Sequence, residues 1–277
     1  MFMAGPASGA VTEVAAPPAR VGPLLREWRR RRRISQLELA LETGVSPRHV
    51  SFVETGRSRP SREMVLQLAA SLDVPLRDRN QLLLAAGYAP VYGQRGLDEP
   101  EMDGVREVLE QLLRGHEPYP AFVADRHWGM VAGNRAVAVL TEGAAPELLE
   151  PPVNILRLSL HPEGVAPRIV NLAELRCRLL EWLGGQAAST GDPALAALYE
   201  ELSALPGEPP SSDDRAASEI AAPLRIRWGG GELSLISTIT TFARATDITV
   251  AELSIESFFP TDHATAEALR NFAAAQS

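Results

Sequence analysis

The chain has 277 residues, of which 45% are hydrophobic, and a formal net charge of −8 at pH 7. This length suits two domains of ordinary size, and no apolar run approaches the about 20 residues that a membrane-spanning helix needs. The single cysteine, Cys177, excludes an intramolecular disulfide, and the first residues do not resemble a signal peptide. We therefore expect a protein of the reducing cytoplasm, with no membrane association.

Charge is divided unevenly along the chain. Residues 20–62 contain eleven arginines and four glutamates, a net charge of +7, so that the remaining residues carry −15. This division predicts a basic module that binds phosphate groups and a separate acidic module. Residues 1–20 lead into the basic segment. They are rich in Ala, Gly and Pro, which predicts a disordered arm.

Residues 21–87 predict five short helices that form a DNA-binding domain. The first is expected over residues 23–32, and residues 34–61 then describe two helices joined by a tight turn. Ser35 and Ser46 are favourable N-caps, Pro47 suits the first position of a helix, and Gly44 suits the left-handed residue that ends one. Two further helices are expected near residues 61–72 and 77–86, and residues 88–100 predict a linker.

The helix after Ser46 carries a polar and aromatic stripe at helical spacing. Its members are Arg48, Ser51, Phe52 and Thr55, whereas Val50 and Val53 point to another side. Such a stripe is poor material for a protein core and suits a helix that reads a DNA groove.

Residues 101–277 predict an α+β domain. A helix is expected over 103–114, two strands over 121–124 and 128–132, and a helix from residue 134. Residues 145–205 are expected to be mostly helical, and residues 205–219 to form a polar, proline-rich loop. Runs rich in Ile, Thr, Leu and Val predict three antiparallel strands over 223–228, 233–242 and 248–256, with a turn at 229–231 and a final helix from residue 262.

The segments SQLELA, GVS and VETGRSRPS resemble the helix-turn-helix of the XRE family of transcription regulators. Further segments, among them HEPYPAFVADRHW and PPVNILRLSLHPEGV, resemble the MmyB-like group, in which an XRE domain precedes a PAS-like ligand-binding domain. By this resemblance, phosphate or base contacts fall to Gln36, Ser46, Pro47, Arg48, Ser51, Phe52, Arg57 and Arg59. Phe52 could instead pack within the protein, because many relatives have a polar residue there.

The resemblance also implies an apolar, fatty-acid-like ligand in the second domain. Candidate apolar contacts are Phe122, Trp128, Ile155 and Phe242, although for any single one of them a place in the core is the default expectation. Candidate partners of a carboxylate head group are His161 and Arg176, with Arg157 and Arg168 as alternatives.

The sequence gives no sign of catalysis. The five histidines and Cys177 lack the spacing of metal ligands or of a nucleophile and its base, and we expect no metal and no cofactor. The sequence therefore predicts a transcription regulator that binds double-stranded DNA as a homodimer and senses an apolar small molecule. Two alternative hypotheses concern the second domain. The second domain could be a dimerisation or docking module without a ligand, or, less in keeping with the residues, an enzyme.

Overall fold

The computed structural model describes residues 20–207 and 223–276, and divides the chain into two compact units, residues 1–91 and 92–277. Most of the expected disordered arm and of the proline-rich loop lies outside the described residues.

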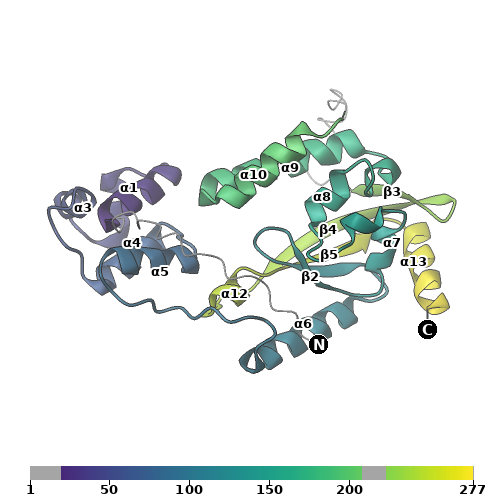
Figure 1. Ribbon diagram of the computed structural model, residues 1–277, viewed down its shortest axis with the longest axis horizontal. Coiled ribbons are helices and arrows are strands. Elements are labelled where there is room, and N and C mark those ends of the chain that lie inside the picture. Colours follow the sequence, from purple (N-terminus) through teal and green to yellow (C-terminus); the bar gives the residue numbers. More distant parts are fainter. Residues whose placement is uncertain (1–19, 208–222, 277) are drawn as a thin grey trace, which may run out of the picture. The chain divides into compact units, whose positions relative to one another are not determined.

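The first unit consists of five helices around one apolar core (Figure 1). Its helices are α1 (Val21–Arg31), α2 (Gln36–Thr43), α3 (Pro47–Glu54), α4 (Arg62–Ser71) and α5 (Leu76–Ala85). Trp28, Leu39, Val50, Val53 and Leu68 are all buried in this core. Each helix therefore contributes its apolar stripe to the centre of the bundle.

Local signals start and stop α2 and α3. The Ser35 hydroxyl accepts a hydrogen bond from the Glu38 backbone N–H, and the Glu38 carboxylate accepts one from the Ser35 N–H, which completes a capping box. Gly44 ends α2 with φ +69°, a conformation that a residue with a Cβ adopts only at a cost. These contacts fix the tight turn that leads into α3.

The second unit is built on a five-stranded antiparallel sheet with strand order β2-β1-β5-β4-β3. The strands are β1 (Ala121–Ala124), β2 (Met130–Gly133), β3 (Leu224–Trp228), β4 (Gly231–Thr241) and β5 (Ser254–Pro260). Gly229 and Gly230 both have positive φ and join β3 to β4 in a two-residue hairpin turn. The α+β class predicted from the sequence is confirmed.

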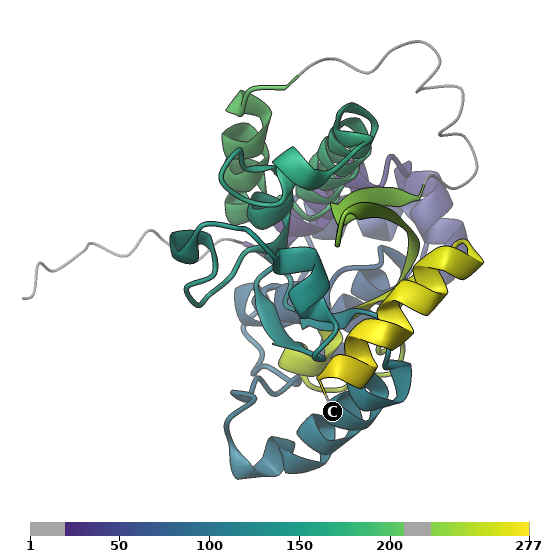
Figure 2. The ribbon, with the colours of Figure 1, turned by 90° about the vertical axis from the view of Figure 1, so that its right-hand side faces the viewer.

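Helices cover both faces of this sheet (Figure 2). The helices are α6 (Asp103–His116), α7 (Val137–Thr141), α8 (Ile155–Leu160), α9 (Leu172–Thr190), α10 (Pro193–Ala204), α12 (Ile248–Ala251) and α13 (His263–Ala275), with short 3₁₀ turns at Pro100–Met102, Pro146–Leu148 and Ala166–Arg168. Leu109 and Leu113 of α6 pack on Ala121 and Val123. The larger cluster on the other face joins Phe122 and Phe258 to α7–α10.

Two strand predictions differ from the structure. Residues 248–256 were expected to form one strand, but Ile248–Ala251 form α12 and β5 begins at Ser254. The Asp247 carboxylate accepts a hydrogen bond from the Thr249 N–H at 2.9 Å, so it caps a helical turn that overrides the β-branched composition. The strand expected from residue 128 begins at Met130, because Trp128 has φ +67° and belongs to the preceding turn.

Candidate functional site

Helix α3 presents one free face because its other face is buried. Ser46 caps it by accepting a hydrogen bond from the His49 N–H at 3.2 Å, and Val50 and Val53 are buried in the core. On the other side Arg48 is exposed and Phe52 is half-buried. The helix thus offers a cation and an aromatic ring to a partner outside the unit.

Two arginines lie against the Phe52 ring. The guanidinium carbons of Arg48 and Arg57 lie 5.2 and 5.9 Å from the ring centroid, within the range of cation–π attraction. The Phe52 carbonyl also accepts hydrogen bonds from the N–H groups of Arg57 and Ser58, at 2.8 and 3.1 Å. The loop after α3 therefore folds back onto the helix and places both arginines against one ring.

A buried carboxylate ties α3 to α1 and α2. Glu54, whose side chain is 2% exposed, accepts hydrogen bonds from Arg29 Nε and Nη2 at 2.7 and 3.0 Å, and from Gln36 Nε2 at 2.8 Å. Burial alone would raise the pKa of the Glu54 carboxyl, but the hydrogen bonds from Arg29 and Gln36 outweigh it and lower that pKa. Glu54 is therefore held as an anion within the bundle.

The backbones of α1 and α3 almost touch at Gly22. A Cβ at this position would lie 2.4 Å from the Val53 carbonyl oxygen and 2.7 Å from that of Glu54. Only glycine permits this approach. The position of α3 is therefore set by a backbone contact as well as by the Glu54 network.

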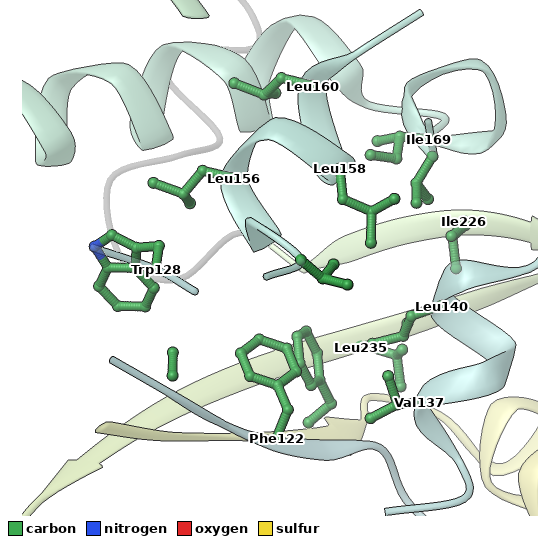
Figure 3. Close-up of a cluster of buried hydrophobic side chains, with 14 of the residues drawn as sticks. Phe122, Trp128, Val137, Leu140, Leu156, Leu158, Leu160, Ile169, Ile226 and Leu235 are labelled. Atoms are coloured by element: carbon green, nitrogen blue, oxygen red, sulfur yellow. The ribbon is translucent and has the colours of Figure 1, made fainter. Parts of the chain in front are cut away.

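In the second unit, an apolar cavity of about 370 Å³ lies between the sheet and α7, α8 and α9. Figure 3 shows Leu158 of α8 pointing toward the sheet, where Phe122 and Leu235 lie, and Leu156 on the side of Trp128. The volume is within the range of small-molecule sites in proteins. Further lining residues are Trp128, Met130, Val137, Leu140, Ile155, Val165, Ile169, Leu175, Leu179, Trp182, Ile226, Ile239 and Phe258.

Two tryptophans form one wall of the cavity. The rings of Trp128 and Trp182 meet edge to face with centroids 4.4 Å apart, and Trp128 Nε1 donates a hydrogen bond to Gln186 Oε1 at 3.0 Å. The turn that carries Trp128 is fixed by Asp125, whose carboxylate accepts hydrogen bonds from the N–H groups of His127 and Gly129. The indole groups are thus positioned by polar contacts while their rings contribute apolar surface.

Few polar side chains reach the lining. They include Glu256 on β5, Ser237 on β4 and Arg178 on α9. The pKa of the Glu256 carboxyl is raised by its burial, and the hydrogen bond with Ser237 lowers it only in part. The cavity therefore combines a large apolar surface with one half-buried carboxyl group.

Comparisons with known proteins match these two units separately. A helix-turn-helix family model matches residues 25–78, and the model of the MmyB-like transcription regulator ligand binding domain matches residues 105–272. The chain belongs to the MmyB-like transcription regulators. It is a DNA-binding regulator with an N-terminal helix-turn-helix, and the family predicted from the sequence is confirmed.

Two further matches were found. An uncharacterized HTH-type transcriptional regulator of Bacillus subtilis (strain 168), RghRB, is 33% identical over 104 residues, which are 36% of this chain and 73% of the relative. Among solved structures, an RNA-binding light-oxygen-voltage receptor matches with a TM-score of 0.26 and 13% identity, over 93% of this chain and 62% of that one. Across the described residues, no helix is both long and apolar enough to cross a membrane.

The residues expected to contact DNA fall into two groups in this MmyB-like regulator. Arg48, Arg57 and Phe52 lie together, with the exposed Ser46 and Pro47 and the half-buried Ser51 on the same short helix. The side chains of Gln36 and Arg59 have partners inside the protein: Gln36 donates to Glu54, and Arg59 Nη2 donates to the Ala86 carbonyl at 3.0 Å and lies over the Tyr88 ring.

Arg32 is anchored in the same way as Arg59. Its Nε donates to the Leu72 carbonyl at 2.9 Å and its Nη2 to the Asp73 carbonyl at 2.8 Å. These two guanidinium groups close helix ends of their own unit.

The residues expected to contact a ligand are also divided. Phe122, Trp128 and Ile155 line the cavity. Phe242 instead packs in the smaller cluster with α6, because it follows the end of β4 and meets the opposite face of the sheet. His161 Nδ1 accepts a hydrogen bond from the Glu163 N–H at 3.1 Å, and Arg176 Nη2 donates to the Ser203 carbonyl at 2.9 Å, so neither belongs to the lining.

The two alternative head-group partners have structural contacts as well. Arg157 pairs with Glu201 at 2.5 Å, and Arg168 donates to the carbonyls of Val139, Glu142 and Arg227. Sequence reasoning missed Glu256 and Arg178. The one signal for Glu256 was the presence of a carboxyl group in the middle of the run SIESFF. A strand of a sheet that is covered on both faces exposes few side chains to water, so a charged residue is unusual there.

Proposed function

We propose that the exposed face of α3 reads DNA through Arg48, with Phe52 as its support. The bidentate guanidinium of Arg48 suits guanine O6 and N7, and Arg57, after the end of the helix, suits a phosphate. The cation–π contacts that hold both arginines on the Phe52 ring support this assignment. Phe52 then acts through the two arginines, and replacing it with Leu should weaken binding while leaving the bundle core intact.

A single short helix contacts only a few base pairs, so we propose that the regulator binds an inverted repeat as a homodimer. Half-sites would be about 10 base pairs apart, or a multiple of that spacing. Sedimentation of the full chain with a duplex selected from a randomised library tests this. One chain per selected duplex would rule the homodimer out.

For the second unit we propose that the cavity binds a small, largely apolar molecule whose occupancy changes the affinity for DNA. The observation that carries this proposal is the cavity of about 370 Å³ lined by aromatic and aliphatic side chains. Burial of an alkyl chain contributes roughly 0.8 kcal/mol per CH₂, so an aliphatic tail alone gives useful affinity. A ligand with different affinities for two states of the protein would shift their populations.

Native mass spectrometry of the purified full chain, before and after organic extraction, tests this proposal. A bound small molecule that extraction removes, and whose return changes affinity for the selected duplex, is the expected result. Absence of any bound mass, together with no effect of C8 to C14 alcohols on melting temperature, would refute it.

One observation favours the alternative, a docking module. Val108 and Leu112 lie one turn apart on α6 and are 45% and 48% exposed. They form an apolar stripe about 100° around the axis of α6 from Leu109 and Leu113, which pack against the sheet. If Val108→Gln with Leu112→Gln converts a dimer to a monomer and ligands have no effect, docking through α6 takes the place of ligand sensing.

A further inference from the structure

Glu256 occupies an unusual place for a carboxyl group. It lies on β5, which pairs with β1 on one side and β4 on the other, and its direct partners across the two ladders are Phe122 and Ile239. Directly opposed residues in antiparallel strands have their Cβ atoms about 5 Å apart. The carboxyl is thus flanked by two apolar side chains, on the sheet face that lines the cavity.

No cation of the protein neutralises this group in the part of the chain that the structure describes. Burial and the Ser237 hydroxyl account for the shift in the pKa of Glu256, and no arginine or histidine contributes to it. Arg178, the other charged residue of the lining named above, comes from α9 and is not among the groups that shift the pKa of Glu256. A half-buried carboxyl that is flanked by apolar side chains and has no counter-charge costs free energy, and a cation brought by a ligand would recover it.

The surroundings of Glu256 also suit a cation with an apolar body. Phe122 and Phe258 lie on the same face of the sheet with ring centroids 5.9 Å apart, and aromatic faces attract ammonium groups. Ser237 and Ile239 are exposed although they line the cavity, and Ile239 is 48% exposed, so the cavity opens at this part of β4. A charged head group could lie at this opening beside Glu256 while a tail extends towards the buried Leu156 and Ile226.

We propose that the cavity selects a cationic amphiphile, an amine with an apolar tail, whose ammonium group pairs with the Glu256 carboxylate. This inference rests on the proposed sensing function and specifies its ligand class. It departs from the carboxylate ligand that the family resemblance implied, because the carboxyl of Glu256 would repel an anionic head group in the same position. A neutral head group would gain at most a hydrogen bond there.

The test compares three probes with the same tail: octylamine, octan-1-ol and octanoate. They are titrated into the full chain at pH 7, where the amine is cationic, and binding is followed by the fluorescence of the tryptophans that line the cavity. Octylamine should bind on the order of tenfold to a hundredfold more tightly than octan-1-ol, the range expected for a hydrogen bond to a charged group.

The variant E256Q keeps the shape of the side chain and removes its charge. It should abolish the advantage of octylamine while leaving the affinity for octan-1-ol within about threefold, which also shows that the cavity is intact. The matched control is E107Q, which makes the same charge change at an exposed residue of α6, away from the cavity. It should leave all three affinities unchanged.

The outcomes separate this inference from the proposed function. If octylamine binds no better than octan-1-ol, or if E256Q keeps its preference, the role of Glu256 is overturned and an apolar sensor remains. If octanoate binds most tightly, the head group is anionic, and Arg178 becomes the residue to replace. If none of the three probes binds, both the sensing function and this inference are wrong.

Discussion

Replacing Glu54 with Ala is expected to destabilise the DNA-binding unit strongly. The carboxylate accepts three hydrogen bonds, two from Arg29 and one from Gln36. Both members of the ion pair are shielded from water, since the side chain of Glu54 is 2% exposed and that of Arg29 is 11% exposed. The variant leaves a guanidinium group inside the protein without its counter-charge.

The size of the effect follows from these contacts. Removing one partner of a buried ion pair costs about 3–5 kcal/mol, chiefly because the remaining charge is buried alone. Arg29 Nη1 keeps a hydrogen bond to the Ile34 carbonyl at 2.8 Å, and this places the expected cost near the lower limit, about 3 kcal/mol. Domains of this kind have about 5–15 kcal/mol of stability in total, so the variant should be folded but much more easily opened.

Hydrogen exchange read by mass spectrometry is the appropriate assay, because it reports on the amides of α1, α2 and α3 separately from the second unit. The matched control is Glu42→Ala, which removes an exposed carboxylate from α2 and should change stability by less than about 0.5 kcal/mol. If Glu54→Ala costs less than about 1 kcal/mol, the network does not hold the three helices together.

The contribution of Glu54 depends on pH with a defined sign. Its pKa in the folded protein is lower than the about 4.3 of an unfolded glutamate, so the folded state binds fewer protons than the unfolded state between these values. The stabilisation is fully present above pH 4.3 and is lost as the pH falls through the folded pKa. The difference between wild type and Glu54→Ala should be constant from pH 6 to 8 and shrink in acid.

Three further predictions use the full chain. Arg57→Ala should weaken binding to all duplexes alike and reduce the slope of log affinity against log salt concentration by about 1. Arg48→Ala should cost ~1–3 kcal/mol of binding free energy on the preferred duplex only, as measured by titrations at several salt concentrations. Equal losses on every duplex for both variants would contradict the assignment. Gly22→Ala should cost about 1–3 kcal/mol in urea unfolding, because its Cβ would overlap the Val53 carbonyl, and an unchanged midpoint would show that the helices can separate. Glu256→Gln should melt at a higher temperature than wild type at pH 8 but not at pH 4. The raised pKa of the Glu256 carboxyl in the folded protein makes the wild type lose stability as the pH rises. Calorimetry of both proteins at pH 4 and pH 8 tests this.

The sequence predicted best those features that depend on neighbouring residues. Ser35, Gly44, Ser46 and Pro47 act within one helical turn, and the structure confirms the caps and the left-handed residue that they predicted. The turn between β3 and β4 was equally visible, because two successive residues with positive φ call for glycine. Helix caps and tight turns depend on residues close in sequence, so they form in the same way in different folds.

Features that depend on distant partners could not be read from the sequence. Gln36 was expected at a phosphate, but its partner Glu54 lies 18 residues further along, and only the packing of α1, α2 and α3 brings them together. Phe242 was expected in the cavity, but it packs on the α6 face of the sheet, because β4 ends at Thr241, just before it. At 248–251 one capping carboxylate outweighed a composition typical of strands.

The anchored arginines change what the charge of +7 over residues 20–62 means for encounter with DNA. Arg29 is neutralised by Glu54, while Arg32 and Arg59 keep their charge with their guanidinium groups bound to backbone carbonyls. A charge fixed in this way still adds to the long-range field that speeds diffusional approach. It displaces fewer counterions on arrival than a side chain that reaches a phosphate. The regulator should therefore find DNA quickly and yet leave non-specific sequence readily.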